Sequence, residues 1–176
     1  MKKIILLAAL ILGSAVVSQA ALTWTWISVP GNPYKTDIQN AMNTACNNYN
    51  TYASYTGTIS VRYNSGVPTA QTDGAWGWIE FGGSRSARVA QHEMGHWHGC
   101  GTYWAWGNYS YSGTWHGSVA KAKCASYGGG TLYSDTQHFW PFGWNYDNEG
   151  PAQYNIGMVG CLIQDMGLIN RNKPGT

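Results

Sequence analysis

Charged residues are scarce in this chain. Asp, Glu, Lys and Arg make up only 10% of its 176 residues. Ten Lys and Arg fall to eight if Lys2 and Lys3 leave with the N-terminal leader described below, and eight equals the number of Asp and Glu. No cluster of Lys and Arg then remains. A near-neutral protein without a basic patch argues against binding to nucleic acid or to an anionic membrane.

Cys-x-x-Cys pairs are also absent. The chain has four cysteines, Cys46, Cys100, Cys124 and Cys161. Because paired cysteines of that spacing supply most Cys-type zinc sites, a site of this type is not expected. An even number of cysteines in an exported chain predicts two disulfides. Three pairings are possible, and we expect Cys100–Cys124 and Cys46–Cys161.

The apolar run at the N-terminus is too short to span a bilayer. Lys2 and Lys3 precede it, and Ser18-Gln19-Ala20 follows it as a small-x-small cleavage site. This pattern predicts a signal peptide over residues 1–20 and places the mature protein outside the cell or in the periplasm. Without repeats or an obvious linker, residues 21–176 are expected to form one domain.

Hydrophobic periodicity predicts an α+β fold, with a small mixed or antiparallel sheet packed on helices and long aromatic, Gly-rich loops. Strands are expected at residues 23–29, 59–63 and 76–81, with a loop over 64–74. Helices are expected at residues 37–52, from 84 or 86 to 98, 118–127 and 152–166. Thr36 or Asp37 is the expected N-cap of the first helix and Ser84 that of the second. Strand 76–81 is expected to form the edge that lines a substrate cleft, and the alternative is an ordinary strand without a role in binding.

The clearest chemical signal is His92-Glu93-Met94-Gly95-His96. On a helix, positions i and i+4 share one face, so His92 and His96 can hold one Zn²⁺. Glu93 then stands beside the metal, where it can take a proton from a zinc-activated water and later deliver it to a leaving amine. This arrangement is typical of zinc hydrolases, most often metallopeptidases.

Catalytic zinc normally has three protein ligands, so one more is needed. His98 is nearby, but on a regular helix it points about 200° away from His92 and His96 and is expected to pack at the helix end. We favour His138, because the neighbouring Asp135 can accept its second ring N–H. Glu149 and His116 are the alternatives. A further donor is needed for the oxyanion, and the sequence offers Tyr146, His116 and Tyr103 for that role.

The motif resembles that of the zincin superfamily of metallopeptidases in His92, Glu93, His96 and Gly99. The extended metzincin pattern does not continue, because Thr102 stands at the position of its third histidine. A broader likeness, over residues 85–168, is to a group of secreted bacterial zincin-like proteins. It is carried by the HExxH motif, Gly101-Thr102 and the block 135–143 that contains His138. The resemblance implies a zincin-like metallopeptidase domain in which His138 belongs to the site.

The leading hypothesis is therefore a secreted, monomeric zinc metallopeptidase that cleaves extracellular proteins, peptides or glycoproteins. The abundance of Trp and Tyr supports a second hypothesis, since their rings make good platforms for sugars and peptides. Under that alternative the protein is a non-catalytic carbohydrate- or cell-wall-binding module whose metal is structural.

Overall fold

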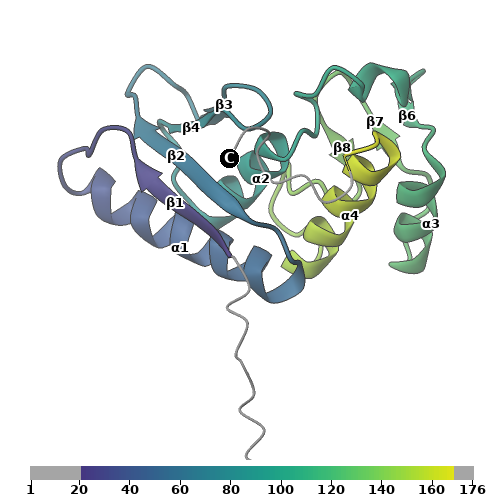
Figure 1. Ribbon diagram of the computed structural model, residues 1–176, viewed down its shortest axis with the longest axis horizontal. Helices are drawn as coiled ribbons and strands as arrows, with labels where there is room; N and C mark the ends of the chain where they lie inside the picture. The colour runs from purple at the N-terminus through teal and green to yellow at the C-terminus, as the bar shows by residue number, and fades with distance from the viewer. Residues whose placement is uncertain (1–20, 169–176) are drawn as a thin grey trace, which may run out of the picture.

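The first half of the chain contains a mixed four-stranded sheet and two helices (Figure 1). The computed structural model describes residues 21–168. The elements of this half are β1 (Leu22–Trp26), α1 (Tyr34–Tyr52), β2 (Gly57–Tyr63), β3 (Ala70–Thr72), β4 (Trp78–Phe81) and α2 (Ala87–Trp97). The strand order is β1-β2-β4-β3, with β1, β2 and β4 parallel and β3 antiparallel to β4. Parallel neighbours need a long crossover, which α1 supplies between β1 and β2.

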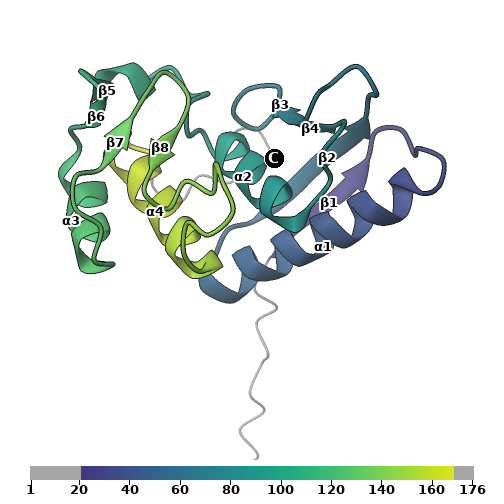
Figure 2. The same cartoon turned by 180° about the vertical axis from the view of Figure 1, so that it is seen from behind.

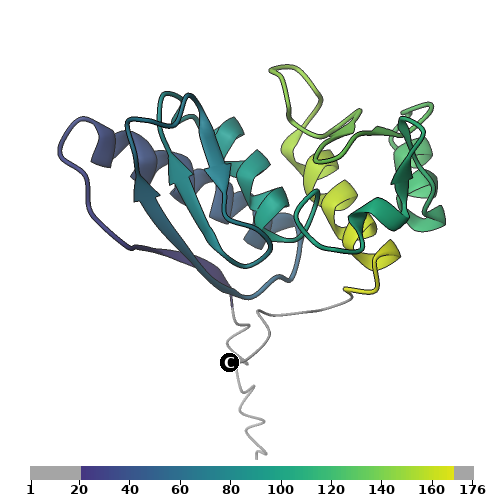
Figure 3. The same ribbon diagram turned by 90° about the horizontal axis from the view of Figure 1, so that it is seen from above.

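Helices α1 and α2 lie together on one face of this sheet (Figure 3). The buried residues of α1 recur at spacings of three and four, which gives the helix one apolar side. They meet alternate residues of the strands, such as Ile59 and Val61 of β2, which are fully buried. Met94 and Trp97 place α2 in the same core. The metal-motif helix is therefore anchored by the first core along its length.

The second half has a small antiparallel sheet and a core of its own. Its elements are η1 (Trp106–Asn108), β5 (Ser110–Tyr111), β6 (Thr114–Trp115), α3 (Ser118–Ser126), β7 (Tyr133–Ser134), β8 (Phe139–Trp140) and α4 (Ala152–Asp165). The four strands pair in chain order. Helix α4 joins the two halves, because Ile156 belongs to the first core while Met158 and Val159 belong to the second (Figure 2).

The predicted α+β class is confirmed, and the four expected helices are present with ends shifted by a few residues. Ser86 rather than Ser84 caps α2, and α1 begins after Pro33 without a side-chain cap at Thr36 or Asp37. The expectation that residues 76–81 form the sheet edge is wrong. β4 lies between β2 and β3, and the edge strand is β3, within the segment expected to be a loop.

The two expected disulfides are absent, because all four cysteines are free. Cys46 is packed in the first core and Cys161 against the second, while Cys100 and Cys124 are buried among apolar side chains of the second. They act there as small hydrophobic residues. Burial raises the pKa of the Cys46 thiol to about 12, so this thiol stays protonated and unreactive at neutral pH.

No helix within residues 21–168 is long and apolar enough to cross a membrane. The predicted signal peptide at residues 1–20 lies outside the described residues.

A thiol count tests the free cysteines. Unfolding the protein in guanidinium without reductant should make all four thiols available to a maleimide. In the native protein Cys161, the one thiol that is partly exposed, should react first, because burial protects the other three. Mass spectrometry after labelling measures both. Fewer than four labels on the unfolded chain would contradict the structure and support the predicted disulfides.

Candidate metal centre

Helix α2 carries His92, Glu93 and His96, and all three line the same cavity. Ser86 starts the helix by accepting the backbone N–H of Val89, at 3.3 Å. The helix ends where Gly99 adopts a φ of +112°, in the left-handed region that favours glycine. This turn brings the Cys100 carbonyl back beside His96, whose Nδ1 it meets at 2.6 Å.

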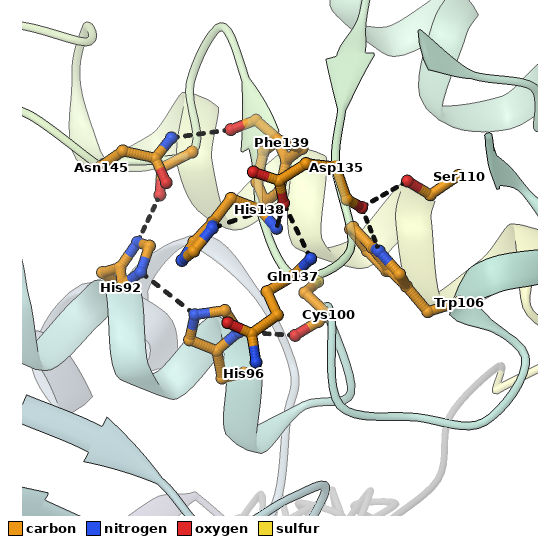
Figure 4. A network of polar contacts seen from close by, with 11 residues as sticks. His92, His96, Cys100, Trp106, Ser110, Asp135, Gln137, His138, Phe139 and Asn145 are labelled. Carbon is orange, nitrogen blue, oxygen red and sulfur yellow. Dashed lines mark hydrogen bonds and ion pairs between the residues drawn. The ribbon is translucent and has the colours of Figure 1, made fainter. Parts of the chain in front are cut away.

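His138 comes from the other half of the chain, just before β8. Its segment reaches α2 because Gly101 has no side chain: a Cβ there would lie 2.0 Å from the Gln137 carbonyl oxygen. Ligand atoms of His92, His96 and His138 all lie within 4.8 Å of one another (Figure 4). Tetrahedral zinc with Zn–N bonds of about 2.0–2.1 Å sets its nitrogen ligands about 3.3 Å apart. The Nε2 atoms of His92 and His96, 3.1 Å apart, are close to this spacing, and the three histidines together form a group that could hold a metal ion.

The hydrogen bonds of the rings identify which nitrogens face the metal position. His92 donates its Nδ1–H to the Gly143 carbonyl at 3.0 Å, and His96 donates its own to Cys100. A carbonyl can only accept, so each Nδ1 carries the proton and each Nε2 has a free lone pair. These two Nε2 atoms lie 3.1 Å apart. Two lone pairs facing each other repel, and a cation between them removes that repulsion.

Burial also favours the ligand form of these rings. It lowers the pKa of His92 to about 3 and that of His96 to about 4, so both imidazoles are neutral at pH 7. His138 lies with Nδ1 3.4 Å from Asp135 Oδ1. Burial alone would raise the pKa of Asp135, but the backbone N–H groups of Gln137 and His138 donate to its carboxylate and lower the pKa overall. The expected role of Asp135 in orienting His138 agrees with this geometry.

Glu93 is buried beside the three histidines, with 6% of its surface exposed. Burial raises its pKa to about 7, and a hydrogen bond from the Thr72 hydroxyl to Oε2, at 2.8 Å, opposes that rise. A cation held by the histidines would further favour the carboxylate. Thr72 lies on β3, so the edge strand fixes the position of this carboxylate.

The histidines open onto two cavities. One, of about 380 Å³, lies between β3 and α2 and includes Glu93 in its wall. The other, of about 690 Å³, is bounded by Trp140, Pro141 and Tyr146. Within residues 21–168 no fourth His, Cys, Asp or Glu joins the three-histidine group. Three protein ligands next to open space are typical of catalytic rather than structural zinc.

Other candidate residues occupy different places. Tyr146 is 76% exposed at the rim of the larger cavity. Glu149 borders that cavity, but its carboxylate accepts the backbone N–H groups of Trp144 and Tyr146, and it is not part of the three-histidine group. His98 packs at the helix end between Tyr49 and Tyr55, as expected.

His116 is not brought to the site. Its ring is exposed and stacks on Tyr111, with ring centroids 3.6 Å apart, and it lines neither cavity. Tyr103 also lines neither cavity; its ring packs edge-on against Trp76. The structure therefore supports neither as an oxyanion donor, and it does not support His116 as a metal ligand.

Sequence reasoning missed Thr72 and Arg88, both of which line the smaller cavity. Arg88 lies one helical turn before His92 on the same face, and this spacing could have identified it. Nothing in the sequence near Thr72 marks the short strand that carries it. Comparisons of the chain with protein families, with curated proteins and with solved structures found no match.

Replacing His138 tests the ligand set. His138→Ala should abolish stoichiometric zinc binding, because two imidazoles alone hold zinc weakly. His116→Ala is the matched control and should bind zinc like the wild type. Metal analysis after dialysis, with chelator competition for the affinity, measures both. Wild-type zinc affinity in His138→Ala would contradict the assignment.

Proposed function

We propose that the protein is a secreted zinc-dependent hydrolase that cleaves peptide bonds in extracellular proteins or glycoproteins. One observation carries the proposal: three imidazole nitrogens converge beside a buried carboxylate, on the wall of an open cavity. The predicted leader at residues 1–20 supports export. The resemblance to zincins remains a prediction from the motif.

Glu93 acts as the general base and then as the general acid. Zinc, when bound, polarises the scissile carbonyl and makes a water more acidic. Glu93 accepts the proton of the attacking water and delivers it to the leaving amine. The Thr72 hydroxyl holds one carboxylate oxygen, which leaves the other free for this transfer.

The position of β3 at the edge of its sheet favours a peptide as the substrate. Residues 70–72 line the smaller cavity together with Glu93, and β3 is the last strand of its sheet. Backbone groups on the outer side of an edge strand can pair with an extended chain. A peptide bound there runs past the metal position, which favours amide hydrolysis over attack on a compact small molecule.

Tyr146 is the proposed donor to the oxyanion. Its hydroxyl is unburied at the rim of the larger cavity, which also includes His92 and His138. A positioned hydroxyl at this place stabilises negative charge that develops on the carbonyl oxygen.

The second candidate is a carbohydrate- or cell-wall-binding module with a structural metal. It is favoured by one observation: the exposed rings of Tyr133 and Trp140 stack with an interplanar angle of 15°. Parallel exposed rings make a platform for a sugar. Under this alternative Glu93 has no chemical role.

Glu93→Gln separates the two candidates. If Glu93 transfers the proton, the substitution should lower hydrolysis of labelled casein by at least about 100-fold while zinc content stays unchanged. Wild-type protein stripped of zinc and then reconstituted is the control for contaminating proteases. Equal cleavage by Glu93→Gln and wild type would overturn the mechanism, and no cleavage by the wild type on any protein substrate would favour the binding module.

Tyr146→Phe tests the oxyanion donor. Loss of one donor to the transition state should lower kcat on the order of 100-fold, with KM nearly unchanged. Tyr111→Phe, which changes an exposed ring not lining the larger cavity, is the matched control. An unchanged kcat in Tyr146→Phe would remove Tyr146 from the mechanism.

A further inference from the structure

We propose that Arg88 is a positioning residue, which fixes loop 142–150 against α2 and thereby orients His92 for metal binding. The inference rests on the metal centre of the proposed function. It concerns metal affinity rather than hydrolysis, so this inference and the proposed peptidase activity can fail separately.

Loop 142–150 has an unfavourable backbone. Phe142 and Trp144 have φ angles of 71° and 58°, in the left-handed region that bulky side chains rarely occupy. Such conformations persist only where surrounding contacts enforce them. The loop must therefore be held by its neighbours, and those contacts identify what holds it.

Arg88 holds the loop from the α2 side. Its Nη1 donates to the carbonyl of Trp144 at 2.7 Å and to that of Asn145 at 3.1 Å. Its Nε also forms an ion pair with Asp147, at 2.8 Å. Asp147 is 84% exposed, so solvent weakens that pair. The two carbonyl contacts, in which the charged donor is only 29% exposed, are the stronger link.

Glu149 holds the same loop from within. Its two carboxylate oxygens accept the backbone N–H groups of Trp144 and Tyr146, at 2.8 and 3.1 Å. Asn145 adds a side-chain bond to the Phe139 carbonyl, at 2.8 Å. At Trp144 both backbone groups are thus bound, the N–H by Glu149 and the carbonyl by Arg88. This double contact explains how a tryptophan is kept at a positive φ.

Gly143 connects the loop to the metal centre, because its carbonyl contacts His92. It lies between the two strained residues Phe142 and Trp144, and its carbonyl accepts the Nδ1–H of His92. Gly143 is packed so closely that a Cβ would lie 2.0 Å from the Phe139 carbonyl oxygen. The direction of its carbonyl therefore depends on the loop keeping its conformation.

Arg88 and His92 contact this loop from successive turns of one helix face. Arg88 fixes the backbone at Trp144, and His92 uses the carbonyl of the preceding residue. If Arg88 releases the loop, the Gly143 carbonyl loses its fixed direction and the His92 ring its orientation. Outer partners of metal-bound histidines commonly change metal affinity by about 10- to 100-fold.

The experiment compares Arg88→Met, Arg88→Lys and Asp147→Asn in the full protein. Met keeps the length of the side chain but removes every donor, whereas Lys keeps the charge without the rigid fork. Asp147→Asn removes only the exposed ion pair and is the matched control. Zinc affinity is measured by chelator competition. Backbone hydrogen exchange of residues 142–150 is measured in the metal-free protein.

We expect Arg88→Met to weaken zinc binding about tenfold and to speed exchange in the loop, with Arg88→Lys intermediate and Asp147→Asn unchanged. A merely structural role would alter thermal stability without changing zinc affinity. Unchanged affinity and exchange in Arg88→Met would overturn the proposal, and so would an Asp147→Asn variant as weak as Arg88→Met. If Arg88→Met does not fold, the comparison of Arg88→Lys with Asp147→Asn decides in the same way.

Two wild-type results separate this inference from the proposed function. If the wild type binds zinc but hydrolyses no peptide bond, the proposed peptidase activity is wrong, and the proposed role of Arg88 still stands. Failure of the wild type to bind zinc would overturn the metal centre together with this inference.

Discussion

The close approach of two imidazole lone pairs is the constraint on which the site depends. The Nδ1–H groups of His92 and His96 are engaged by backbone carbonyls, so their Nε2 atoms meet at 3.1 Å without a proton to share. Burial keeps both rings neutral at pH 7. Such an arrangement is unfavourable by itself and becomes favourable around a cation. Much of the surrounding structure can be understood as holding these two carbonyls in place.

The site lies where the two halves of the molecule meet. Helix α2 is anchored in the first core, whereas His138 is supplied by the chain of the second half, and α4 belongs to both cores. Two glycines allow close backbone contacts: Gly101 lies against the backbone of Gln137, and Gly143 against that of Phe139. The geometry of the three histidines is therefore a property of the whole fold, although two of them are only one helical turn apart.

What could be predicted from the sequence follows from local chemistry. The HExxH helix and its end at Gly99 have strong local signals, and Asp135, three residues before His138, favours His138 as a ligand. Short strands lack such signals: three residues of β3 show no alternation, and the sequence therefore predicts the edge in β4, the strand just before the HExxH helix. The even number of cysteines in an exported chain predicts disulfides, but in this fold the cysteines fill apolar sites. His116 has the right chemistry for a ligand, but the fold places it elsewhere, and its position along the chain does not reveal this.

We propose that His92, His96 and His138 together hold one zinc ion that keeps an open position. X-ray absorption spectroscopy of the zinc-loaded protein tests this proposal. A site of this kind should show three nitrogen ligands at about 2.0–2.1 Å and one oxygen ligand from solvent. A sulfur ligand, a fourth protein ligand that closes the site, or a chain that takes up no zinc would contradict it.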